Sequence, residues 1–105
     1  MKHLIHAAAL VAALSAPTTA SAETEQENCA NVASVARMIM ESHQKGLALA
    51  DLFAMIERNF SDPEIVTAYQ EMALIAYGEP RYQTEAAQKR SVAEFRDFFH
   101  VWCLS

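Results

Sequence analysis

The residues that could do chemistry are few and stand far apart in the sequence. His43 and His100 are the only histidines after residue 22, and neither lies in a nucleophile or metal-binding motif. A Ser-His-Asp or Cys-His hydrolase needs a nucleophile held by a base, and a metal needs several ligands together. Carboxylate pairs such as Glu94 and Asp97 are common on solvated helix faces. We therefore predict a protein that is not an enzyme and that has no metal or cofactor.

Two cysteines could provide metal ligands, free thiols or a cross-link. Cys29 and Cys103 are separated by most of the chain and form no Cys-x-x-Cys pair, which argues against a zinc finger. Two separate buried thiols remain the alternative to a disulfide. In an oxidising compartment we expect the disulfide. Closing a loop of about 75 residues would contribute roughly 4.5 kcal/mol in the chain-entropy model, which is comparable to the whole stability of a small domain.

The first 22 residues have the layout of a secretory signal peptide. Lys2 precedes an apolar run from Leu4 to Leu14, and Ala20-Ser21-Ala22 provides the small residues of a cleavage site. A membrane anchor is the alternative, but a spanning helix needs about 20 apolar residues. We expect cleavage before Glu23. Residues 23–105 would then form a single helical domain that is periplasmic or secreted and not stably inserted in a membrane.

Composition and charge exclude several classes of protein. The chain is 52% hydrophobic with two Gly and three Pro, which argues against disorder and against a Gly-rich phosphate-binding loop. Its net charge is -5, and its eight Lys and Arg residues are scattered. Nucleic acid and anionic membrane surfaces are therefore not expected partners, because both require clustered basic residues.

The elements that must position these residues are helices. Apolar residues recur at helical spacing in four segments, so we predict an all-α fold, a small bundle of about four helices closed by one disulfide. The first helix is expected from Asn28 to just before Gly46, and the second ends near Asn59. The predicted buried stripes are Cys29, Val32, Ala33, Ala36, Ile39, Met40 and His43, then Leu49, Leu52, Phe53 and Ile56, then Ile65, Tyr69, Met72 and Ala76, and finally Val92, Phe95, Phe99 and Trp102.

Helix-capping and helix-breaking residues predict where the remaining helices begin and end. Asp62-Pro63-Glu64 combines an N-cap side chain, a proline at the first helical position and an early carboxylate, so it predicts the start of the third helix. Gly78 and Pro80 end that helix, and Thr84 can cap the last one. The two cysteines would then join the start of the first helix to the end of the last.

The turn between the last two helices gathers aromatic and basic residues. Tyr77, Arg81 and Tyr82 surround Gly78 and Pro80, and Tyr and Arg are frequent anchors of protein interfaces. One hypothesis is that these three residues bind a partner. The alternative is that the tyrosines fill the helix junction while Arg81 pairs with a carboxylate such as that of Glu85.

The positions Cys29, Arg37-Met38-Ile39, Lys45-Gly46, Ala76-Tyr77, Pro80-Arg81-Tyr82, Phe95 and Cys103 together form a pattern over nearly the whole of residues 23–105. The pattern resembles a group of small exported two-cysteine helical proteins of proteobacteria and their phages, which are uncharacterised. The resemblance implies export, size and the disulfide, and it carries over no catalytic residue. The periplasmic acid-stress chaperones are less similar, because their cysteines are placed differently.

These observations predict an exported protein-interaction or modulator module whose partner is an unknown envelope protein. The alternative function is that of a periplasmic acid-stress chaperone. The two differ in acid, because such a chaperone should loosen and expose apolar surface near pH 2 to 3 whereas a rigid binding module should stay folded.

Overall fold

The computed structural model describes the backbone of residues 3–105 and the side chains from Thr24 onward. It contains α1 (His3–Gln44), α2 (Leu49–Asn59), α3 (Pro63–Tyr77) and α4 (Glu85–Leu104), with no strand among the described residues. The predicted all-α fold of about four helices is therefore confirmed.

The first helix begins earlier than the expected start at Asn28. α1 begins at His3, because the Ala- and Leu-rich segment before Glu23 is itself made largely of good helix formers. Met1, Lys2 and the side chains of residues 1–23 lie outside the described part, so the signal peptide predicted at residues 1–22 stays a prediction. Among the described residues, no helix is long and apolar enough to cross a membrane.

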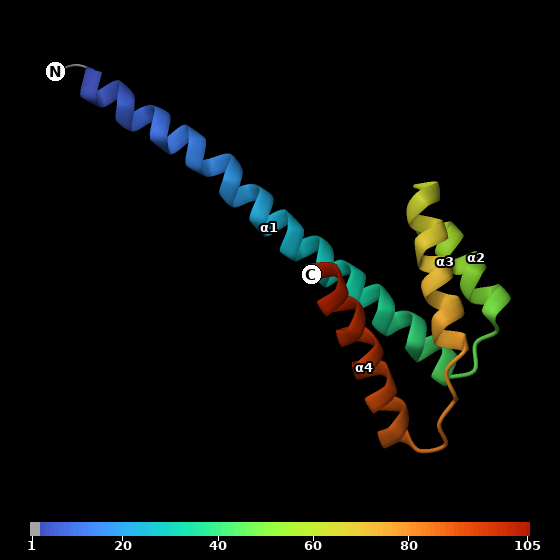
Figure 1. The fold of residues 1–105 in the computed structure, drawn as a ribbon. Helices are drawn as coiled ribbons and strands as arrows, with labels where there is room; N and C mark the ends of the chain where they lie inside the picture. Colours follow the sequence, from blue (N-terminus) through green and yellow to red (C-terminus); the bar gives the residue numbers. More distant parts are fainter. Residues whose placement is uncertain (1–2) are drawn as a thin grey trace.

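The other three helices pack around the C-terminal part of α1. Figure 1 shows α4 running antiparallel beside this part of α1, while α2 and α3 form an antiparallel pair that packs against α1 near its C-terminal end. α3 contacts both α1 and α2, but it makes little direct contact with α4. This arrangement leaves α3 and α4 as two separate neighbours of the same central helix.

The core follows the stripe predicted for the first helix. Ala36 and Ile39 are fully buried, and Met40 is nearly so. The small residues Ala73 and Ala76 of α3 are fully buried in the same cluster. The complete buried apolar cluster consists of Ala36, Ile39, Met40, Leu52, Ile56, Met72, Ala73, Ala76, Phe95 and Phe99.

Two residues of the predicted buried stripes are exposed instead. Ile65 is 42% exposed and Trp102 is 66% exposed. Both residues share the buried face of their helix, since Ile65 stands seven residues before Met72 and Trp102 stands seven residues after Phe95. They are exposed because each lies near one end of its helix, beyond the buried residues Met72, Ala73 and Ala76 of α3 and Phe95 and Phe99 of α4. A direct α3–α4 interface would have covered them, and this fold has almost none.

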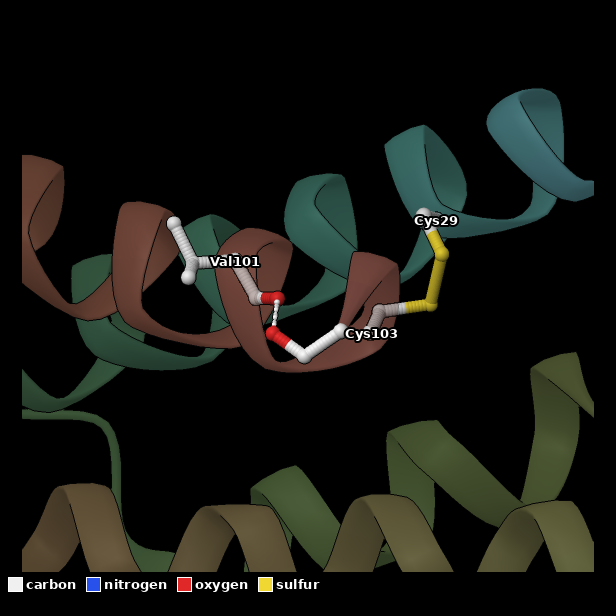
Figure 2. The surroundings of a disulfide bond; sticks show 4 residues. Cys29, Val101 and Cys103 are labelled. Carbon is white, nitrogen blue, oxygen red and sulfur yellow. Dashed lines mark hydrogen bonds between the residues drawn. A yellow bond between two sulfur atoms is a disulfide. The ribbon is translucent and has the colours of Figure 1, made fainter.

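The predicted disulfide joins α1 to the last turn of α4. The Sγ atoms of Cys29 and Cys103 are 2.08 Å apart and their Cα atoms are 5.5 Å apart (Figure 2). In the same turn, the Ser105 hydroxyl donates a hydrogen bond of 2.7 Å to the carbonyl oxygen of Val101. The C-terminal end of α4 is therefore tied to α1 covalently.

The predicted helix caps are confirmed. The Asp62 side chain accepts a hydrogen bond of 2.9 Å from the backbone N–H of Glu64, and the Thr84 hydroxyl accepts one of 3.2 Å from that of Ala87. Pro63 occupies the first helical position of α3, where its missing N–H costs nothing. These contacts fix where α3 and α4 begin.

The packing of α4 yields a stability prediction. Phe95 is buried and its ring lies 5.0 Å from that of Phe99, so Phe95→Ala should lower the free energy of unfolding by about 3 to 5 kcal/mol. Glu94→Ala is the matched control, because the neighbouring Glu94 is exposed and its loss should change stability by less than about 0.5 kcal/mol. Chemical denaturation of both variants measures the difference. Equal midpoints would show that the buried face of α4 is misassigned.

Candidate functional site

The segment from Tyr77 to Tyr82 lies against the end of α1. Gln44 is buried, and its side chain holds this segment from both sides. The Gln44 amide Nε2 donates to the carbonyl oxygen of Pro80 at 2.9 Å, and its Oε1 accepts from the backbone N–H of Tyr82 at 2.9 Å. The Arg81 guanidinium donates to the Gln44 carbonyl oxygen at 3.3 Å. One glutamine therefore clamps the turn onto the end of α1.

His43 and Tyr77 complete this junction. The His43 Nε2 donates to the carbonyl oxygen of Glu79 at 2.6 Å, and the His43 ring lies 4.4 Å from that of Tyr77. The Tyr77 hydroxyl donates to the carbonyl oxygen of Leu47 at 2.6 Å. Burial raises the pKa of the Tyr77 phenol, so the hydroxyl stays protonated and remains a donor.

The three residues of the hypothetical binding turn thus occupy different environments. Tyr77 and Arg81 make hydrogen bonds to backbone carbonyls of the α1–α2 junction. Glu85 pairs with Lys89 at 2.9 Å, so Arg81 contacts a carbonyl where a carboxylate was one expectation. Tyr82 is 41% exposed and borders a hollow next to α4. The turn therefore supplies a support for the junction and one exposed aromatic residue.

A hollow of about 800 Å³ lies between α3 and α4, and residues of α1 also line it. Phe98 and Trp102 of α4 line it, as does Ile75 of α3, and these side chains are 63%, 66% and 56% exposed. The other lining residues are Asn28, Asn31, Val32, Phe60, Ile65, Ala68, Tyr69, Glu71, Met72 and Phe99.

A second hollow of about 310 Å³ continues this surface toward the turn. The two hollows share Ile75, Phe98 and Phe99, and the second one also reaches Tyr82. We call both hollows together the apolar groove. Most of the side chains that line it are exposed, so the groove is an open surface and not an enclosed cavity.

Aromatic rings stiffen the walls of the apolar groove. On α4, the ring of Phe99 lies 5.1 Å from that of Phe98 and 6.3 Å from that of Trp102, both edge to face. On the other side, the rings of Phe60 and Tyr69 are 4.9 Å apart. Burial raises the pKa of the Tyr69 phenol, so this residue adds no charge. The groove therefore presents a preformed aromatic surface.

The charged residues of the apolar groove are all acidic. Glu71, Glu79 and Glu94 line it, and within residues 24–105 no lysine or arginine does. Lys45, Lys89 and Arg96 instead line a separate hollow, where Glu41 and Glu85 accompany them. This separate hollow lies on a different face of α4, so basic side chains line one face of the helix while only acidic charged residues line the apolar groove.

The two histidines of residues 24–105 make separate contacts. The Nε2 atom of His43 donates its hydrogen bond to the carbonyl oxygen of Glu79. His100 lies beside Asp97, whose pKa is lowered mainly by its hydrogen bond with Arg96. From Thr24 to Ser105, no three His, Cys, Asp or Glu residues lie together in a way that could hold a metal ion.

The sequence contains a signal for the apolar groove that a search for single stripes misses. α3 carries Leu74 and Ile75 beside its buried stripe, and α4 carries Phe98 and Val101 beside its own. One face of a helix cannot bury neighbouring apolar positions that point in different directions. A helix with more apolar residues than one buried stripe can hold therefore has a second apolar face, and this face is exposed.

Comparison with known proteins adds no identification. No protein-family model, no curated protein and no solved structure matches the chain. The function is therefore inferred from the chain's own residues and geometry.

The junction yields a prediction for its two glycines. Gly46 has a φ of 87°, and a Cβ atom there would lie 2.9 Å from Nη2 of Arg81. Gly46→Ala should therefore destabilise the protein by about 1 to 2 kcal/mol, because alanine avoids this left-handed conformation and Arg81 must move. Gly78→Ala is the control, since Gly78 has a helical φ of -79° and should tolerate alanine. Thermal unfolding compares the two; a Gly78 variant as unstable as the Gly46 variant would contradict the assignment.

Proposed function

We propose that this chain is an exported protein of the periplasm that acts as a protein-interaction or modulator module and not as an enzyme. The observation that carries the proposal is the apolar groove. Exposed apolar surface that gathers into one continuous patch is uncommon on a small domain, and it is typical of interaction sites. The aromatic side chains in the groove are of the kinds that dominate binding energy at protein interfaces.

The supports of the groove favour the same proposal. The disulfide holds the end of α4 that carries Trp102, and the Gln44 clamp holds the segment that leads into α4. A surface that is held in place before binding loses less conformational entropy when a partner arrives. The groove is thus organised for binding without a large rearrangement.

Export rests on two features that agree with each other. Residues 1–22 have the composition of a signal peptide, and Cys29 and Cys103 form a disulfide. Disulfides persist mainly in oxidising compartments such as the bacterial periplasm. The periplasm is therefore the compartment in which we expect the partner.

Export predicts the mass of the processed protein. Expression of the full chain in a Gram-negative cell should yield periplasmic protein that begins at Glu23 and contains no free thiol. Intact-mass analysis after alkylation without reductant measures both properties. Recovery of the unprocessed chain in the cytoplasm, with Cys29 and Cys103 alkylated, would contradict the proposed location.

Interaction through the groove predicts site-specific cross-linking in cells. A photoreactive phenylalanine analogue at Phe98, inside the apolar groove, should give defined adducts with envelope proteins. The same analogue at Ala50, which is exposed on α2 outside the groove, should not give these adducts. A third position, Tyr82, tests the end of the groove nearest the turn. Identical adduct patterns at positions 98 and 50 would contradict the interaction function of the groove.

A further inference from the structure

We propose that the occupant of the apolar groove is an amphipathic helix of a partner protein, with one apolar face flanked by lysine or arginine residues. The inference rests on the proposed interaction function and deepens it by stating the chemistry of the partner. It combines three properties of the groove: its helical walls, its exposed aromatic surface and its acidic border.

The walls of the groove favour a helical occupant. α3 and α4 stand on two sides of α1, and a gap between helices accepts another helix by the packing of side-chain ridges into grooves. An extended peptide commonly binds by adding a strand to an exposed sheet edge. Residues 3–105 contain no strand and therefore offer no such edge. Apolar anchors spaced along one helix face would meet Trp102, Phe98 and Ile75.

The border of the groove favours a basic occupant. Glu71, Glu79 and Glu94 are exposed around the apolar surface. No basic side chain from the described residues lines the same surface to neutralise them. Complementary charges at an interface border speed association and reject partners of the wrong sign. Lysine or arginine beside the apolar face of the occupant would pair with these three carboxylates.

The same charges disfavour the two other possible occupants. In a symmetric dimer each copy presents the same surface, so two grooves facing each other would bring carboxylates toward carboxylates. An anionic membrane surface attracts clustered basic residues, whereas the groove border is acidic. A second copy of the chain and a lipid surface are therefore outcomes that the test must be able to detect.

The experiment uses two designed helical peptides that share one leucine face, one with lysine and one with glutamate on the polar face. The protein is used as an expressing Gram-negative cell processes it, with the disulfide intact. Trp102 is the only tryptophan in the chain and lines the groove, so its fluorescence reports occupancy directly. We expect the lysine peptide to shift the Trp102 emission to shorter wavelength and to bind at least tenfold more tightly than the glutamate peptide.

Matched variants separate the groove from general charge attraction. Glu71→Gln, Glu79→Gln and Glu94→Gln together should weaken binding of the lysine peptide about tenfold at low salt, since three border pairs contribute some tenths of a kcal/mol each. Glu41→Gln, Glu57→Gln and Glu85→Gln change the net charge equally outside the groove and should weaken it less than twofold. Ile75→Ala with Phe98→Ala should abolish binding. Circular dichroism confirms that all variants stay folded.

Several results would overturn the inference. They are equal affinity for both peptides, equal effects of the two Glu→Gln sets, and no Trp102 shift with either peptide. A Trp102 shift that follows protein concentration alone, with a doubled mass in light scattering, would assign the groove to a second copy. A shift caused by vesicles of anionic lipid would assign it to a membrane. If cross-linking at Phe98 still captures specific proteins, only the basic helix is wrong; if that cross-linking also fails, the proposed function fails with it.

Discussion

The disulfide between Cys29 and Cys103 is the constraint on which the rest of the structure depends. It ties the C-terminal turn of α4 to α1, while hydrogen bonds from Gln44 fix the segment that leads into α4. With both ends fixed, α4 must lie along α1 and bury Phe95 and Phe99 against it. The cross-link contributes about 4.5 kcal/mol by restricting the unfolded chain, which is a large share of the stability available to a domain of this size.

The same two attachments explain why the groove stays open. Burying a large apolar side chain yields about 1.5 to 3 kcal/mol, so α3 and α4 would gain from closing over Ile75 and Phe98. α4 is fixed to α1 along its length, and α3 is held by α2 and by the hydrogen bond from Tyr77 to Leu47. Movement of either helix toward the other would disturb these contacts. The apolar area that the fold leaves exposed is therefore available for contact with a partner.

The sequence predicted most of the fold because the relevant signals are local. Asp62, Thr84 and Gly78 set helix ends through contacts within a few residues, and the α1 stripe follows from helical periodicity alone. The cysteine pair followed from only two thiols and the placement of the helices that carry them. Such features depend little on how the helices are arranged in space.

The groove could not be predicted in the same way. Periodicity identifies the apolar face of a helix, but it does not say how much of that face another helix covers, and this is why Ile65 and Trp102 were assigned to the core. The sequence left two roles open for Tyr77, partner binding or filling of the helix junction, and its contact with a carbonyl 30 residues earlier in the chain favours the second. Only the three-dimensional arrangement brings these groups together.

The position of the titratable groups favours a binding module that works at neutral pH over an acid-triggered chaperone. Among the described residues, the buried polar side chains are His43 and Gln44, and no carboxylate is buried. His43 donates through Nε2 to the carbonyl oxygen of Glu79.

Acid acts instead on exposed groups. Hydrogen bonds from Lys89 and Arg96 lower the pKa of the Glu85 and Asp97 carboxyls, so their contribution to stability is present at neutral pH and is lost as the pH falls through the lowered values. Both carboxyls are fully exposed, and solvent screening keeps that contribution small. Loss of these two ion pairs in acid therefore removes little stability, and the disulfide does not titrate. Since the apolar groove is already exposed in the folded state, its accessibility does not require acid unfolding.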